Sequence, residues 1–301
     1  MLVPDNWAEL LEPGLKKLFD KHTRKKKDYL KEIYNVEKST RAQEHHQGVG
    51  SLGLMEDWED SDNQVSYEDV NKGYKQTYTH RKYSKGMQIQ RELLEDELYG
   101  EIKKKVRLLN QTLYYTRQYF AALPFNNAWS GSYLGPDSQP LCSASHPYSP
   151  VDATTWNNTA TYTLTATNLE LVRTAMKGWK DDKGNLLGIE ANLLVVPTAL
   201  RKPALVIADT DKEPDVTDNN VNVWHGAIDV IEWDFLTDAN AWFVCDRERM
   251  KTFLNWYDRR YPKLERAAQE FDTEVGKYKI VGRWSQGWDE ASFVFGCTGT
   301  D

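Results

Sequence analysis

The chain has 301 residues, of which 40% are hydrophobic and 28% charged, and its formal net charge is −7. This length and composition predict a globular protein with one large domain or two smaller ones. The negative charge argues against a protein that acts mainly by coating nucleic acid, because phosphate binding draws on clustered Lys and Arg, but it leaves room for a local basic patch.

Residues 1–38 are predicted to form one or two amphipathic helices. Pro13 and Gly14 interrupt a helix face made by Trp7, Leu10, Leu11, Leu15, Leu18 and Phe19. Between Lys16 and Lys31 there are eight Lys or Arg residues against two Asp. This basic stretch is either a solvated helix face or an arm that contacts an acidic neighbour or packaged nucleic acid.

Residues 41–90 contain little that could form a core. Glycines at positions 48, 50 and 53 loosen the chain, and seven acidic residues follow with no positive residue between them: Glu56, Asp57, Glu59, Asp60, Asp62, Glu68 and Asp69. We expect a turn at 71–73 and then a strand at 74–83 that is polar on both faces. Such a stretch predicts a long two-stranded arm held by something outside the subunit, with disorder as the alternative.

Residues 92–123 are predicted to form one long helix, which Pro124 ends. At roughly 1.5 Å of rise per residue it would be about 48 Å long. Acidic residues crowd its start and basic residues follow, as the helix dipole favours. Its apolar stripe consists of Leu94, Leu98, Ile102, Val106, Leu109, Leu113 and Phe120. A long helix in an unrelated α+β domain would give the same pattern.

A polar connection rich in Gly, Ser and Pro follows, and it runs to Pro150. His146 has no neighbouring His or Cys, so we expect a turn or core histidine there. Residues 154–167 alternate in the manner of a strand, and Asn168 is predicted to cap a helix. The buried positions of that helix are predicted to be Leu169, Val172, Met176 and Trp179.

The last third of the chain is predicted to consist mainly of strands. A turn at 181–184 precedes an apolar strand at 192–197, of the kind that is buried on both faces. Further strands are expected at 221–223, 230–235 and 241–245, and residues 250–261 fit a strand or a helix. The end is predicted to be an antiparallel pair that turns at 285–287, with alternating residues Tyr278, Ile280, Trp284, Ala291, Phe293 and Phe295.

The sequence contains no recognised catalytic or ligand-binding motif. The sequence lacks phosphate-loop, dinucleotide-binding, serine-hydrolase and zinc-protease signatures. The acidic loop 209–220 lacks the Gly and Glu of a calcium-binding EF-hand, and His45 with His46 lies in a loose region that could not fix metal geometry. Three dispersed cysteines indicate neither a zinc site nor a disulfide framework. We therefore predict no catalytic, cofactor-binding or metal-binding residues.

Targeting signals are also absent from the sequence. No apolar window approaches the ~18 residues of a membrane span, and residues 1–11 have no signal-peptide core. We expect a soluble, unexported protein that does not contact a membrane. A carbohydrate-active enzyme remains a distant alternative, because carboxylates are plentiful although no motif pairs them.

The order of these segments resembles that of the major capsid proteins of tailed bacteriophages with the Hong-Kong-97-type fold. Within that family the sequence looks most like the Mu-like major head subunit group. The resemblance runs from about Gln43 to the end of the chain. Its motifs lie at 74–83, 86–89, 91–96, 125–129, 143–147, 193–197 and 241–246.

The resemblance implies an α+β fold with five parts. These are an N-terminal arm (1–47), an E-loop (48–90), a P-domain with its spine helix (91–180, helix about 92–123), an A-domain (181–246) and strands that return to the P- and A-domains (247–301).

The resemblance also implies a structural protein of the virion. Copies would assemble in the host cytoplasm as hexamers and pentamers, forming an icosahedral shell around the phage genome. The implied partners are further copies, portal, scaffolding and decoration proteins, and double-stranded DNA at the inner surface. An encapsulin-like compartment protein of the same fold is the alternative.

Opposite charges suggest how copies would meet. Lys25, Lys26 and Lys27 are expected to contact Glu56, Asp57, Glu59 and Asp60 of a neighbouring subunit, because complementary charge guides docking. Tyr74, Tyr78 and Arg81 in the E-loop are expected to lie at the same contact. The rival interpretation is that the basic arm lines the interior and meets packaged DNA.

Overall fold

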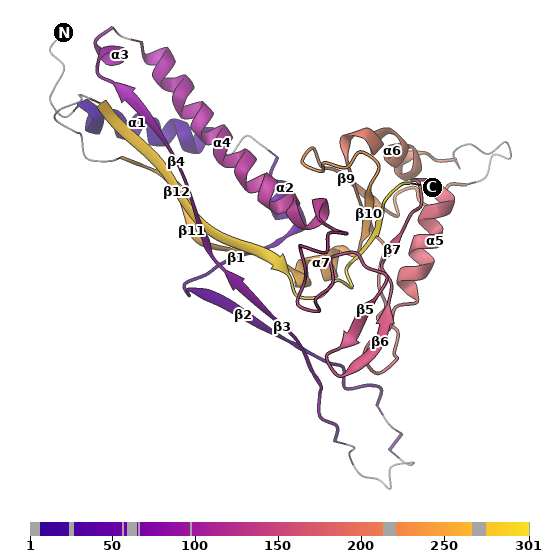
Figure 1. The fold of residues 1–301 in the computed structure, drawn as a ribbon. Helices are drawn as coiled ribbons and strands as arrows, with labels where there is room; N and C mark the ends of the chain where they lie inside the picture. Colours follow the sequence, from indigo (N-terminus) through magenta and orange to yellow (C-terminus); the bar gives the residue numbers. More distant parts are fainter. Residues whose placement is uncertain are drawn as a thin grey trace.

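The structure is a computed structural model, which describes residues 7–23, 27–55, 57–58, 65, 67–96, 98–212, 221–266 and 275–300. Figure 1 shows two sheets with their helices and, projecting from them, a long hairpin. A four-stranded sheet and a five-stranded sheet form the body, and two-stranded hairpins are attached to it.

The four-stranded sheet, called the long sheet below, has the order β1-β11-β12-β4. Strand β12 is antiparallel to both β11 and β4, whereas β1 is parallel to β11. Its strands are β1 (Asn35–Lys38), β4 (Arg81–Gln90), β11 (Leu254–Arg266) and β12 (Val275–Trp288).

Two helices, α1 (Trp7–Thr23) and α4 (Tyr99–Asn126), cover one face of the long sheet. They bury Leu15, Phe19, Ile102, Val106, Leu109 and Leu113 against Ile89, Leu264, Tyr278 and Ile280 of the strands. The apolar stripe predicted from helical spacing is therefore confirmed from Ile102 onward. The short helix α2 (Tyr29–Ile33) also contacts α4.

The predicted boundaries of the long helix are wrong at both ends. A short helix α3 (Glu92–Glu95) stands apart from α4. Leu98, between the two helices, is 44% exposed. At the other end α4 continues past Pro124, because the backbone and side-chain N–H groups of Asn127 both bond the Leu123 carbonyl and complete the last turn. A proline in the last turn removes one hydrogen bond but does not have to end the helix.

The five-stranded sheet has the order β7-β13-β10-β8-β9. Its strands are β7 (Thr159–Ala160), β8 (Leu193–Val196), β9 (Asp229–Glu232), β10 (Trp242–Cys245) and β13 (Val294–Cys297). Helices α5 (Ala166–Lys177) and α6 (Arg201–Asp209) pack on it, with the 3-10 turn η1 (Thr198–Leu200) before α6. The predicted buried strand at 192–197 and the predicted strand at 241–245 are confirmed, as are the buried positions Leu169, Val172 and Met176 of α5 and Trp179 just after it.

Several local predictions for this part are wrong. Residues 221–223 form no strand, only a bridge between Val221 and Lys212. The cap of α5 is Thr165, whose hydroxyl accepts the Asn168 backbone N–H at 3.1 Å. The ambiguous segment 250–261 contains the end of helix α7 (Arg247–Phe253) and the start of β11. Helix α7 is capped by Asp246.

The predicted terminal pair is also wrong. Strand β12 continues through 285–287, and β13 belongs to the other sheet, antiparallel to β10. Alternation identifies a strand but not its partner. Gly287 marks a close approach and not a turn, because a Cβ there would lie 3.1 Å from the ring of Tyr78.

Strands β2 (Gln43–Val49) and β3 (Lys72–Thr79) pair antiparallel and form the projecting hairpin. The connection is residues 50–71, so the turn predicted at 71–73 is wrong. Gly48 and Gly73 let the strands approach closely, because a Cβ on Gly73 would lie 2.8 Å from the Gly48 carbonyl carbon. A smaller hairpin is formed by β5 (His146–Ser149) and β6 (Asp152–Trp156). As predicted, His146 is a core residue, stacked on Trp156 and bonded to Asp137.

Candidate functional site

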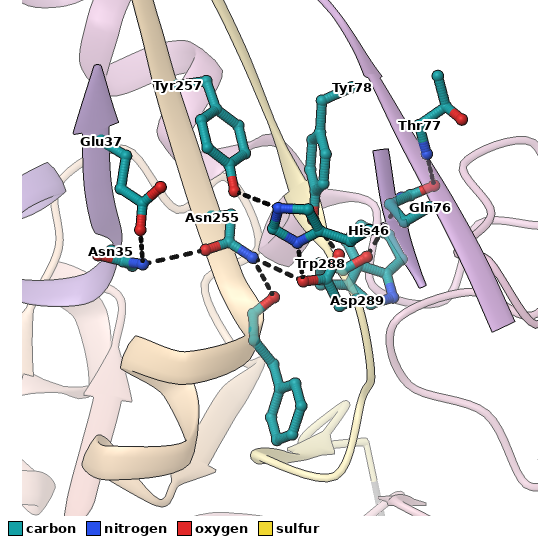
Figure 2. Close-up of polar contacts among 11 residues, drawn as sticks. Asn35, Glu37, His46, Gln76, Thr77, Tyr78, Asn255, Tyr257, Trp288 and Asp289 are labelled. Carbon is teal, nitrogen blue, oxygen red and sulfur yellow. Dashed lines mark hydrogen bonds and ion pairs between the residues drawn. The ribbon is translucent and has the colours of Figure 1, made fainter. Parts of the chain in front are cut away.

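The hairpin arm, residues 43–79, meets the body through a group of polar side chains that we call the anchor cluster: His46, Tyr78, Asn255, Tyr257 and Asp289. Figure 2 shows them converging on the Asp289 carboxylate, which follows directly after β12. The Tyr78 hydroxyl donates to Oδ1 at 2.6 Å, and the Asn255 amide donates to Oδ2 at 2.8 Å. His46 Nδ1 lies 2.7 Å from the same Oδ2.

The hydrogen bonds indicate which tautomer a neutral His46 imidazole adopts. Because a carboxylate only accepts, Nδ1 carries a proton and donates to Asp289. Nε2 lies 2.7 Å from the Tyr257 hydroxyl, which donates to it when the imidazole is neutral. One chain of hydrogen bonds thus runs from Tyr257 in β11 through His46 in β2 to Asp289, and it joins the arm to the long sheet.

Burial keeps the two phenols of the cluster neutral. Tyr78 is 2% and Tyr257 3% exposed, and their ring centroids are 5.1 Å apart in an edge-on contact. Burial, and after it the Asp289 charge, raises the pKa of Tyr78. Burial and the nearby carboxylates of Glu37 and Asp289 likewise raise the pKa of Tyr257. Both hydroxyls therefore remain hydrogen-bond donors throughout the ordinary pH range.

Strand alternation explains why one face of the arm reaches the body. Residue 46 is paired with 76 and residue 44 with 78, so His46, Gln76 and Tyr78 point the same way. Gln76 donates to the Trp288 carbonyl at 3.2 Å on the same side. The predicted strand is polar, but this face is engaged with the body, and His46 lies in an ordered strand rather than in the loose region that the sequence suggested.

A second contact holds the arm farther out, at the predicted turn 181–184, which is confirmed by the hydrogen bond from Gly184 N–H to the Asp181 carbonyl. The Ser51 N–H donates to Asp182 Oδ1 at 2.9 Å. Lys183 forms an ion pair with Glu68 at the surface. Exposed pairs contribute only about 0–1 kcal/mol, so this contact is weaker than the anchor cluster.

The loop at the end of the arm, residues 50–71, exposes apolar side chains. Met55 is 100% and Tyr67 92% exposed. The other large apolar residues exposed there are Leu52, Leu54, Trp58, Val65 and Val70. An exposed apolar surface of this kind marks an interaction site.

The structure places five of the predicted contact residues. Tyr78 is buried in its own chain, in the anchor cluster, and Tyr74 is partly buried in β3. Arg81 is exposed at the start of β4, and Asp57 is exposed in the loop. Lys27 is exposed and forms an ion pair with Glu32 at 3.6 Å. Lys25, Lys26, Glu56, Glu59 and Asp60 lie outside the described residues.

The described residues include no group of three or more His, Cys, Asp or Glu side chains that could hold a metal ion. In the same part of the chain no helix is both long and apolar enough to cross a membrane.

The long sheet, its covering helix and the projecting arm form the Hong-Kong-97-type capsid fold. The fold is similar to the bacteriophage JBD30 capsid, with 18% identity and a TM-score of 0.53 over 70% of this chain and 91% of that one. It is similar to Microbacterium phage Oxtober96, with 11% identity and a TM-score of 0.54 over 88% of this chain and 89% of that one. It is also similar to the virus-like particle from Pyrococcus furiosus, with 9% identity and a TM-score of 0.54 over 95% of this chain and 98% of that one.

Residues 73–295 match the model of a family described as phage capsid protein. The chain belongs to that family, and it is therefore a structural component of a phage virion. A search of curated protein sequences found no match.

Proposed function

We propose that this chain is the major head subunit of a tailed phage of the Mu-like group. Copies would assemble in the host cytoplasm as hexamers and pentamers, closing into an icosahedral shell around the double-stranded genome. Portal, scaffolding and decoration proteins would be its further partners, and the subunit itself would carry out no catalysis and need no cofactor. The family match favours a phage shell over an encapsulin-like compartment.

The hairpin arm is the observation that carries this proposal. Its base is bonded to the body through the anchor cluster, and Ser51 and Glu68 of its loop contact the turn at 181–184, whereas Met55 and Tyr67 of the loop are exposed. Ordering a backbone costs about 1–2 kcal/mol per residue, so an extended loop requires a surface to lie on. A neighbouring copy supplies that surface in a shell.

The expected division of the chain into parts remains our proposal: N-terminal arm 1–47, E-loop 48–90, P-domain 91–180, A-domain 181–246 and returning strands 247–301. The pairing of β2 with β3 makes residues 43–47 part of the hairpin as well. The pairing of β4 with β12 joins residues 81–90 to the long sheet.

We further propose that charge guides assembly. Lys25, Lys26 and Lys27 of one copy would contact Glu56, Asp57, Glu59 and Asp60 of another, with Tyr74 and Arg81 beside that contact. Tyr78 would act indirectly, by fixing the direction of the arm. Reversing the three lysines to Glu should weaken assembly and change its salt dependence. Normal empty shells that fail to retain DNA would instead indicate that the basic residues face the genome.

Negative-stain electron microscopy of the purified protein tests the proposal directly. Rings or closed shells are expected from the full chain. A variant in which residues 52–69 are replaced by a short Gly/Ser linker should fold, with an unchanged circular dichroism spectrum in the far ultraviolet, but should not assemble. A full chain that stays monomeric under all assembly conditions would overturn the proposal. Particles that enclose a protein cargo instead of nucleic acid would favour the compartment protein.

A further inference from the structure

A hollow of about 160 Å³ lies between helix α4 and the long sheet, and residues of α4, β4, β11 and β12 line it. Figure 1 shows α4 lying along β4 and β12 in this part of the molecule. The lining includes no residue of the anchor cluster and none of the described residues proposed above for contacts between copies. The proposed assembly therefore gives this hollow no role.

Short side chains on both walls leave this space open. In the ladder of β4 and β12, Tyr83 is paired with Gly282, and directly paired residues point to the same side of a sheet. The Tyr83 ring contacts Phe120 of α4, with ring centroids 4.5 Å apart, so this side faces α4 and Gly282 adds no side chain to it. The helix contributes Thr112 and Thr116, whose hydroxyls donate to carbonyls one turn earlier in α4 at 3.0 and 2.7 Å. Those hydroxyls are thus engaged within the helix.

Stacked aromatic rings form the wall on the sheet side. Trp284 is 2% exposed, and its ring stacks on those of Tyr83 and Trp256, with centroids 4.4 and 5.9 Å away. Gly282 is required for this wall, because a Cβ there would lie 2.4 Å from the Trp284 ring. A flat ligand ring gains from offset or edge-on contact with such a wall in addition to the burial of its apolar area.

The size and charge of the lining define the ligand that fits. An apolar protein cavity of about 150 Å³ accepts a benzene ring, so this volume suits one small aromatic group. Of the described residues that line the hollow, Lys85 alone carries a charge, and it is exposed. Lys85 is paired with Ile280, which is 4% exposed, so the lysine stem points to the same side as a buried residue. An anionic group at the mouth would meet one cation and no carboxylate of the lining.

We propose that this hollow, called the ring pocket below, binds a small aromatic carboxylate. The ring lies between α4 and Trp284, and the carboxylate lies at Lys85. Because the ligand contacts α4 and the strands of the long sheet together, it binds the folded subunit and not the unfolded chain, and it raises the stability of the fold. Such binding needs one subunit only and is independent of assembly.

Isothermal titration calorimetry of the purified full chain tests the proposal, with indole-3-acetate as the probe. For a ligand of roughly 13 non-hydrogen atoms we expect a dissociation constant of about 1 mM. Neutral indole should bind about threefold more weakly, because it lacks the partner of an exposed lysine. At about 10 mM indole-3-acetate the melting temperature of the chain should rise by about 2 °C.

Variants locate the two ends of the ligand. Thr116→Leu fills the ring pocket with apolar atoms, so binding of both probes should weaken at least tenfold while the chain still folds. Lys85→Gln should weaken binding of indole-3-acetate about threefold and leave that of indole unchanged. The matched control Lys82→Gln changes an exposed lysine of the same strand that does not line the pocket, and it should bind both probes as the original chain does.

Three results would overturn the proposal. The first is the absence of binding heat with both probes, and the second is binding that Thr116→Leu leaves intact. The third is an equal loss in Lys85→Gln and Lys82→Gln, because the carboxylate would then respond only to the overall charge. If Thr116→Leu does not fold, Thr112→Leu fills the pocket from the neighbouring turn of α4 and decides the same question.

Discussion

Replacing Tyr78 by Phe tests whether the anchor cluster holds the arm to the body. The substitution removes one oxygen from a side chain that is 2% exposed, and it leaves the ring packing in place. Asp289 Oδ1 then loses its donor, while Oδ2 keeps His46 and Asn255. The measured change thus isolates one hydrogen bond.

The size of the effect follows from the charge of the acceptor. A hydrogen bond to a charged group contributes roughly 1.5–3 kcal/mol. Unfolding entropy is about 2.1 cal/mol/K per residue, which for this chain is roughly 0.6 kcal/mol/K. We therefore expect Tyr78→Phe to lower the melting temperature of the unassembled subunit by about 3 °C.

Differential scanning calorimetry of the unassembled subunit measures this shift. Tyr119→Phe is the matched control, because Tyr119 is 54% exposed, and its effect should stay within about 0.5 kcal/mol. A double-mutant cycle with Asp289→Asn should give a coupling energy of about 0.5–3 kcal/mol. A coupling near zero, or equal effects of the two Tyr variants, would refute the assignment of this bond as the anchor.

Two other predictions concern the long sheet. Arg117 makes a bidentate ion pair with Asp258 at 2.8 and 3.0 Å. Replacing Arg117 by Met should therefore lower the free energy of unfolding by about 3–5 kcal/mol, measured by denaturant titration. The matched control Arg173→Met removes an exposed ion pair and should lower it by less than about 1 kcal/mol. Burial, and next the charge of Arg283, lowers the pKa of His80 from 6.5, so stability should be complete above that pH and fall as pH drops toward the lower folded-state pKa. His80→Gln should flatten this dependence in melting curves taken between pH 7 and about pH 5, and an unchanged slope would show that other groups cause it.

Local periodicity could be predicted from the sequence, whereas partners could not. The positions from Ile102 to Leu113 follow the helical repeat, and the strand at 193–196 is apolar throughout, so each carries its own signal. The sequence carries no signal for which strand pairs with β12, because its alternation of apolar and polar residues is compatible with either β11 or β13 as the partner. In the folded chain β12 pairs with β11, and β13 pairs with β10 instead.

The anchor cluster was beyond sequence reasoning for the same reason. His46 and Asp289 are 243 positions apart, and neither belongs to a motif. Alternation of Gln76 and Tyr78 on one face of β3 is the signal that could have indicated a buried side of the arm. It was weak, since Thr77 and Thr79 on the opposite face are also typical strand residues.

The position of Asp289 determines how the subunit bears tension. The arm is bonded to the chain just beyond the end of β12, and that strand runs between β11 and β4 with ladder hydrogen bonds on both sides. These hydrogen bonds are perpendicular to the strands, so a pull along the arm loads many of them at once in shear instead of peeling them apart singly. Figure 1 shows β3 and β4 lying along nearly the same line as β12, which runs antiparallel to β4, so a pull along the arm is directed along these strands.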